Sequence, residues 1–167
     1  MTMNRLDDPK LIKLDRMRYA KNTFSSRLTY LAILFNVFYF VSIYESDVGS
    51  WYYQILIGAS IVYNLVFMLV AFLASEGVKN YKIGYAWALI VAGLGQIARI
   101  FILPMQAYRA TVTISKVTYP VMQSSQLTWV IIWLCLSVLC CLAAGATGVY
   151  RSRILSAYNA SLNKKAA

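Results

Sequence analysis

Four long runs of apolar residues are separated by polar segments along this chain of 167 residues. The runs cover about residues 28–44, 51–75, 83–104 and 127–150. A helix needs about 20 apolar residues to cross the hydrocarbon of a bilayer, so only the first run is slightly short. We therefore predict an all-α membrane protein with a four-transmembrane-helix bundle over residues 28–150. A basic arm (1–27) precedes the bundle and a basic tail (151–167) follows it.

The composition supports this fold class. Hydrophobic residues make up 60% of the chain and charged residues 13%. A soluble domain usually has about half of its residues apolar and about a quarter charged. The apolar excess is gathered into blocks longer than a soluble core requires, as expected for one bundle that spans a membrane.

The arm contains one local signal for a helix. Asp8 can act as an N-cap and Pro9 suits the first helical position, which predicts a helix over about 9–23. Its apolar residues do not form a clean stripe, because Asp15 and Arg18 interrupt it. Two interpretations remain open: a solvated basic arm near lipid headgroups, or a docking segment for a partner subunit.

Lys and Arg residues are unevenly distributed: seven lie in residues 1–27, two in 76–82 and four in 151–167, but two in 104–126. Because Lys and Arg collect in cytoplasmic loops, we expect both termini in the cytoplasm, with the plasma membrane as the site. The net charge of +10 is then explained by the membrane, since basic segments attract anionic lipids at the cytoplasmic face. No DNA- or RNA-binding motif accompanies this charge, so nucleic acid is not an expected partner.

Three polar residues inside the runs predict contacts between helices. Asn36, Tyr39 and Ser42 follow one another at spacings of three residues, and Ser60 and Asn64 lie about one helical turn apart. Polar side chains in lipid face other helices rather than the hydrocarbon. We interpret them as interhelical hydrogen-bonding groups, with a substrate site as the alternative.

Small residues predict where helices approach closely. Gly84, Ala88 and Ala92 repeat every four residues in the third run, and Gln96 continues the series. The end of the fourth run is also small, with Ala144, Gly145 and Gly148 among its residues. Such small-xxx-small ridges allow two helix backbones to pack tightly, so we predict packing surfaces at both places.

Arg99 is a charge deep within an apolar run, which marks a functional or structural site. Counted from Pro104, it lies about 7 Å from the outer end of its helix at 1.5 Å per residue. Pairing within the chain, snorkelling to headgroups and contact with another subunit are the three possibilities. Side chains lean towards the helix N-terminus, which is cytoplasmic here, so we favour pairing within the chain. Glu45 and Asp47 are the candidate anions, and Gln96 lies one turn away.

The connection over residues 104–126 is the one long segment outside the runs. Pro104 is expected to stop or kink the third helix. The residues around 111–119 alternate β-branched apolar residues with Thr and Ser, which predicts a β-prone outer loop between helices three and four. A lone strand is unstable, so it should pack on the bundle, pair with itself or join another protein's sheet. Its candidate contact residues are Tyr108, Arg109, Lys116 and Tyr119.

Catalytic chemistry has little support in the sequence. The chain contains no His, all six acids lie outside the apolar runs or at their ends, and its three cysteines share one run. General bases, metal ligands and ion-coupling carboxylates are therefore poorly represented, and we expect no enzyme activity, cofactor or metal. The leading hypothesis is a non-catalytic accessory subunit of a membrane complex, such as a transporter assembly, with other integral membrane subunits as partners. The alternatives are a small oligomeric transporter or channel, and a membrane-organising tetraspan scaffold.

Overall fold

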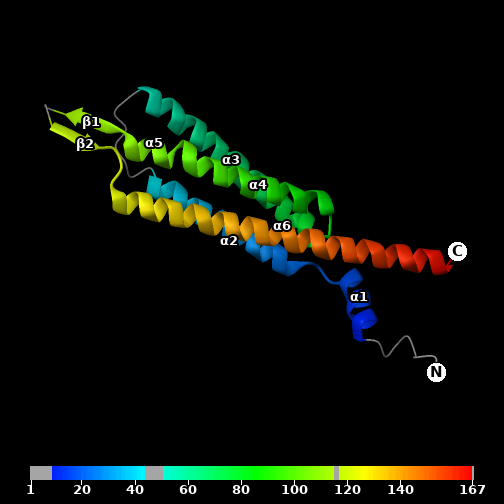
Figure 1. The fold of residues 1–167 in the computed structure, drawn as a ribbon. Helices are drawn as coiled ribbons and strands as arrows, with labels where there is room; N and C mark the ends of the chain where they lie inside the picture. Colours follow the sequence, from blue (N-terminus) through cyan, green and yellow to red (C-terminus); the bar gives the residue numbers. More distant parts are fainter. Residues whose placement is uncertain (1–8, 44–50, 115–116, 167) are drawn as a thin grey trace.

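The computed structural model describes residues 9–43, 51–114 and 117–166, and this part of the chain is mostly helical. The long helices run side by side in an elongated bundle (Figure 1). The elements in chain order are α1 (Pro9–Tyr19), α2 (Thr23–Ile43), α3 (Trp51–Lys79), α4 (Ile83–Ile102), α5 (Pro104–Arg109), β1 (Thr111–Ile114), β2 (Val117–Pro120) and α6 (Ser124–Ala166).

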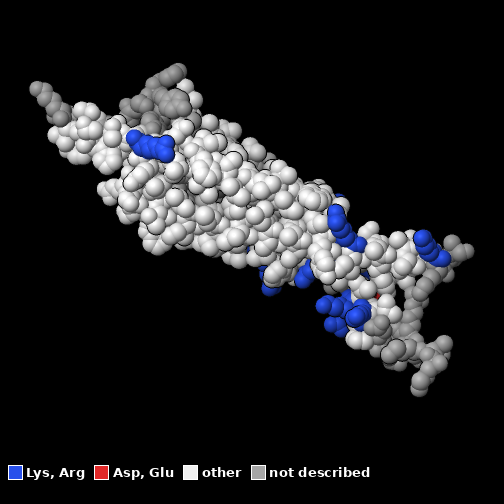
Figure 2. All heavy atoms as spheres, viewed as in Figure 1, with Lys and Arg blue, Asp and Glu red and all other residues white. Residues whose placement is uncertain are grey.

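The two ends of the bundle carry different elements. Strands β1 and β2 extend from one end, which we call the hairpin end, and α1 and the last part of α6 lie at the other, which we call the termini end (Figure 1). Most of the Lys and Arg side chains in Figure 2 lie towards the termini end, while the middle of the bundle shows little charge on this face. The two ends of the bundle therefore differ both in the elements that they carry and in their charge.

Four helical segments are long and apolar enough to cross a membrane, which confirms the predicted number of spans. The first begins earlier than predicted, because α2 starts at Thr23 and has 21 residues. Two polar residues at its start, Ser25 and Ser26, are buried between helices. The first span is therefore long enough, since buried polar side chains extend it beyond its apolar run.

Pro104 interrupts the third span without ending it. Helix α4 stops at Ile102, but Leu103 keeps a right-handed helical backbone and its N–H bonds to the carbonyl of Arg99 at 3.4 Å. Pro104 then occupies the first turn of α5, where its missing N–H costs no hydrogen bond. The helical run consequently continues to Arg109 and has 27 residues.

The fourth span continues into the tail. Helix α6 runs unbroken for 43 residues to Ala166, so no helix end separates residues 127–150 from the region beyond. After Gly148 this stretch contains neither Gly nor Pro, and nothing local stops the helix. Its last turns contact α1, where the Tyr158 hydroxyl donates to Asp15 Oδ1 at 2.6 Å. Helix α1 begins at Pro9 as expected and is shorter than predicted.

The helices are packed as a bundle with α6 against both α2 and α4, and α3 against the same two helices. Three groups of buried apolar residues follow one another along the bundle. The group at the hairpin end includes Leu103 and Ala107, so α5 belongs to the core. On the outside, large apolar side chains such as Val91, Phe101 and Leu139 are more than 60% exposed, as suits a surface that faces lipid.

The connection between α5 and α6 contains a two-stranded antiparallel hairpin. Val112 pairs with Tyr119 and Thr113 with Thr118, so β1 and β2 satisfy part of each other's backbone hydrogen bonds. The four residues of β2 are all exposed. Of the arrangements that the sequence left open, the structure has pairing of the segment with itself.

Candidate functional site

The candidate site is a buried polar cluster around Arg99, in the interior of the bundle. Arg99 projects from α4 with 5% of its surface exposed, and Ser60 and Asn64 of α3 face it. Its Nη1 donates to Asn64 Oδ1 at 2.6 Å, and its Nη2 donates to Ser60 Oγ at 2.7 Å and to the Ser60 carbonyl at 3.3 Å. Charge-assisted hydrogen bonds of this length are among the stronger polar contacts in proteins.

A third helix completes the cluster. Asn36 of α2 donates through Nδ2 to Asn64 Oδ1 at 2.9 Å, and its own Oδ1 accepts from Gln96 Nε2 at 3.1 Å. Arg99 Nη1 also lies 3.5 Å from Asn36 Oδ1. The structure thus brings together Asn36, Ser60, Asn64, Gln96 and Arg99, which the sequence had placed on three separate runs.

Two tyrosine rings cover the guanidinium. The Arg99 Cζ atom lies 4.3 Å from the centre of the Tyr39 ring and 4.9 Å from the centre of the Tyr63 ring. Both distances are short enough for cation–π attraction, which strengthens where water is excluded. Tyr63 was not predicted as a site residue, although its position three residues after Ser60 places it on the same helix face.

The cluster has hydrogen-bonding capacity left over. Two buried atoms, Asn64 Nδ2 and Gln96 Oε1, have no hydrogen-bond partner within the described part of the chain. A free amide donor and a free amide acceptor inside a membrane bundle are each costly. The site is therefore able to accept one more polar group, such as a water molecule or part of a ligand.

A cavity of about 380 Å³ between α3 and α4 reaches this cluster. Arg99, Ser60 and Tyr63 form its polar part. The remaining walls are apolar and come from both helices: Ala59, Gly95, Ala98, Ile102 and Leu103. The cavity gives the guanidinium region a route to the surface between two helices.

Arg99 lies farther from the end of its helical run than predicted. The helical run ends at Arg109, ten residues beyond Arg99, which is roughly 15 Å at 1.5 Å per residue. The side chain points into the bundle, so snorkelling does not describe it. The predicted partners Glu45 and Asp47 lie outside the described residues, and the contacts seen are with neutral side chains of α2 and α3.

The predicted packing ridge on α4 has no neighbour within this chain at its first position, and its contact with another helix stays a prediction. A side chain at Gly84 would meet nothing within 4 Å, and Ala88 and Ala92 are half-buried. The face that packs within the chain includes Ala86 and Gly93, which are buried. Several faces of this helix carry small residues, so their spacing alone could not select the one in contact.

The small residues of α6 do lie at a helix contact. A Cβ atom on Gly145 would stand 2.6 Å from Ile90 Cγ1 and 2.9 Å from the carbonyl oxygen of Ala86. One on Gly148 would stand 3.0 Å from the Ala86 Cβ, and Ala144 is fully buried. Here the backbones of α4 and α6 approach closely because the side chains are missing.

A second set of polar contacts near the termini end was missed in the sequence. Ser26 and Ser75 share a hydrogen bond of 2.8 Å between α2 and α3, and Ser25 and Thr147 share one of 2.9 Å between α2 and α6. Ser and Thr occur often at the ends of apolar runs, so their identity carries little signal. Only the burial of their side chains distinguishes them.

The outer-loop candidates are not gathered into one site. Tyr108 and Arg109 are exposed at the end of α5, and Tyr119 is exposed in β2. Lys116 lies outside the described residues. No group of three His, Cys, Asp or Glu side chains comes together among the residues that the structure describes.

No protein-family model, curated protein or solved structure matches this chain. Its class is therefore defined by its own structure: four helices of sufficient length and hydrophobicity make it consistent with a multi-pass helical membrane protein. In its interior, one arginine is held between three helices by amide, hydroxyl and aromatic groups.

Proposed function

We propose that this chain is a non-catalytic accessory subunit of a larger membrane complex, such as a transporter assembly, which it stabilises or regulates through helix packing. The proposal rests on one observation: the Arg99 side chain points into the bundle, and its N–H groups donate to Ser60 and Asn64 of the same chain. A charge used in this way holds helices together. The groups around it are amides, hydroxyls and phenol rings, which are weak acids and bases at neutral pH.

The proposed orientation has both termini in the cytoplasm of a plasma membrane. The concentration of Lys and Arg towards the termini end supports it (Figure 2). The hairpin then lies outside, where Val117 and Tyr119 are half-exposed on one face of β2. An isolated hairpin is marginally stable, and contact with a partner subunit would add the packing that it lacks.

Purification in mild detergent from the native membrane tests the proposal. We expect the chain to be recovered with a second polypeptide at fixed stoichiometry, as measured by native mass spectrometry. A Val117→Ser/Tyr119→Ser double variant should lose much of this partner, whereas Thr113→Ser, on the other face of the hairpin, should retain it. Recovery of every variant as a lone monomer with normal thermal stability would refute the proposal.

A small oligomeric transporter or channel is the second candidate. The cavity between α3 and α4 favours it, because this cavity is lined by a buried cation, Arg99, and by the hydroxyl groups of Ser60 and Tyr63. Solute flux by the purified chain alone in liposomes, abolished by the cavity-filling change Ala98→Phe, would support this function. Absence of flux with a range of small anions and neutral solutes would exclude it for those solutes.

A further inference from the structure

Two cavities meet on α6 near the termini end. The first, of about 890 Å³, lies between α1, Tyr81 and the part of α6 that carries Tyr150, Arg151 and Ile154. The second is a groove of about 480 Å³ along α6 and α4. Both are lined by Tyr150 and Ile154, so the two cavities are adjacent. This surface is separate from the Arg99 cluster, and it does not depend on the accessory-subunit function.

The first cavity is strongly basic. Five cationic side chains line it: Lys10, Lys13, Arg16, Lys21 and Arg151. No acidic residue of the described chain lines it. Asp15, on the same helix, is instead engaged by the Tyr158 hydroxyl, which ties α1 to α6. The field in this cavity therefore favours an anion.

One of these cations is held in position before any ligand arrives. Arg151 Nη1 donates to Asn22 Oδ1 at 2.7 Å, and its guanidinium lies over the Phe24 ring at 5.6 Å. Asn22 is itself buried and bonded to Ser25 and to the carbonyl of Lys79. A preorganised guanidinium loses less conformational entropy when it binds phosphate.

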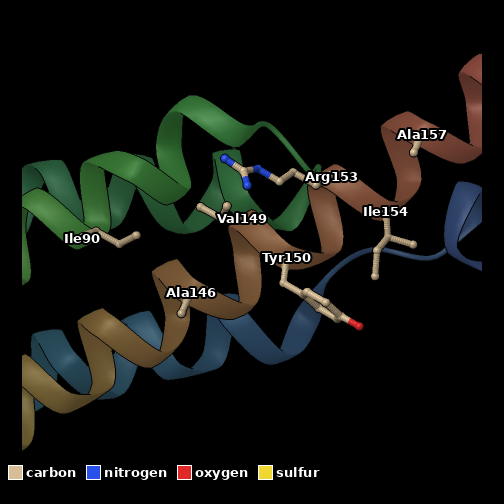
Figure 3. Close-up of a pocket in the computed structure, with 7 residues that line it drawn as sticks. All are labelled: Ile90, Ala146, Val149, Tyr150, Arg153, Ile154 and Ala157. Carbon is tan, nitrogen blue, oxygen red and sulfur yellow. The ribbon is translucent and has the colours of Figure 1, made fainter.

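The groove is mostly apolar and follows α6 from its apolar run into its basic tail. Figure 3 shows Ile90 of α4 facing the helix that carries Ala146, Val149 and Tyr150, with Ile154 and Ala157 further along the same helix. Ile90 and Ala146 lie in the apolar runs of α4 and α6, whereas Arg153 lies in the basic tail and is the charged residue of the groove. The groove thus passes from apolar residues to a charged one, as a phospholipid passes from its acyl chains to its headgroup.

We propose that these two cavities form one binding site for an anionic glycerophospholipid. Its phosphate lies among the basic side chains of α1 and Arg151, and an acyl chain lies against Ile90, Ala146 and Val149. A free phosphate ester would satisfy the basic cavity alone, and the adjoining apolar groove is the reason to assign a lipid. Binding clamps α1 onto the end of α6, because the basic side chains on both elements contact the same headgroup.

The headgroup half is tested with the full chain in detergent, incubated with phosphatidylglycerol or phosphatidylcholine and analysed by native mass spectrometry. The chain should retain phosphatidylglycerol preferentially. A Lys13→Gln/Arg16→Gln variant should retain it about 25-fold less, since each basic residue near an anionic headgroup contributes roughly a fivefold change. The matched control, Arg18→Gln/Lys164→Gln, removes the same charge outside the cavity and should change retention little. An equal loss in both variants means a diffuse charge effect and overturns the site.

The acyl half is tested with Ala146→Phe, which fills the groove. Lost contact with two methylenes corresponds to about a tenfold weaker retention. Ala143→Phe, exposed one turn earlier on α6 and outside the groove, is the control and should bind normally. Glycerol 3-phosphate, which has the phosphate without acyl chains, should displace little lipid. Complete displacement at equal concentration, or unchanged retention in Ala146→Phe, would show a site for a soluble phosphate ester and overturn the lipid assignment.

Discussion

In the half of the bundle towards the hairpin, α2, α3 and α4 meet through Arg99 and its amide and hydroxyl partners, whereas towards the termini end α4 and α6 meet through glycine and alanine. The first contact depends on a few long polar side chains with fixed geometry. The second depends on side chains that are missing, at Gly145 and Gly148. Apolar side chains gain little free energy when they move from lipid to a protein interface, so both contacts hold helices together by other means.

The comparison shows that the two halves respond to different kinds of change. The Arg99 cluster is sensitive to the loss of atoms, because each member satisfies another. The contact of α4 with α6 is sensitive to added atoms, because the neighbours include the backbone oxygen of Ala86, which cannot rotate away. Four substitutions test this difference.

Arg99→Ala is expected to have the largest effect. It removes the N–H groups that donate to Ser60 Oγ and Asn64 Oδ1, and it leaves a cavity between three helices. The free energy of unfolding should therefore fall by about 3 kcal/mol. Unfolding of the reconstituted protein by a denaturing detergent measures it. Arg109→Ala, an exposed arginine at the end of α5, is the control and should change it by less than about 0.5 kcal/mol. Equal effects would mean that the cluster does not hold the helices.

Gly145→Ala adds one methyl group at the contact of α4 and α6. The new atom would approach Ile90 and the Ala86 carbonyl more closely than real contacts allow, so stability should fall by about 2 kcal/mol through overpacking. The control is Gly84→Ala, where nothing lies within 4 Å and better helix propensity should raise stability by up to about 1 kcal/mol. A stabilising Gly145→Ala would contradict the close approach.

A double-mutant cycle of Arg99→Ala with Asn64→Leu measures the coupling inside the cluster. The two residues share a hydrogen bond of 2.6 Å, so their effects should be non-additive by about 1 kcal/mol. Arg99→Ala combined with Ser26→Ala, which shares no partner with it, should be additive. Strictly additive losses in the first cycle would refute a cooperative cluster.

Ser26→Ala should have the smallest effect. It removes the hydrogen bond to Ser75 at 2.8 Å between α2 and α3, and such bonds in membrane proteins average about 0.6 kcal/mol. Ser156→Ala, at an exposed position on α6, should have no measurable effect. A loss above about 2 kcal/mol for Ser26→Ala would place this bond on a level with the Arg99 cluster and remove the contrast between the two halves.

Much of the fold and part of the site could be predicted from the chain alone. Long apolar runs are sufficient to predict spans, because the cost of exposing backbone groups to lipid leaves a helix as the available structure. Asn36, Ser60, Asn64 and Arg99 stood out singly, since a polar residue in an apolar run is rare. The end of α6 was not predictable from hydropathy, because a solvated helix needs favourable propensity rather than apolar residues.

By itself, the sequence determined that there are four apolar helices, that charge collects outside them, and that one arginine and several polar residues lie within them. These follow from transfer of each residue between water and lipid, which depends on residue type and order. Only the tertiary structure decided that Asn36, Ser60, Asn64, Gln96 and Arg99 meet, that Ala86 rather than Gly84 faces α6, and that α1 borders a basic cavity on α6. The rotation of each helix about its axis is set by contacts with residues distant in the chain, and no local pattern contains them.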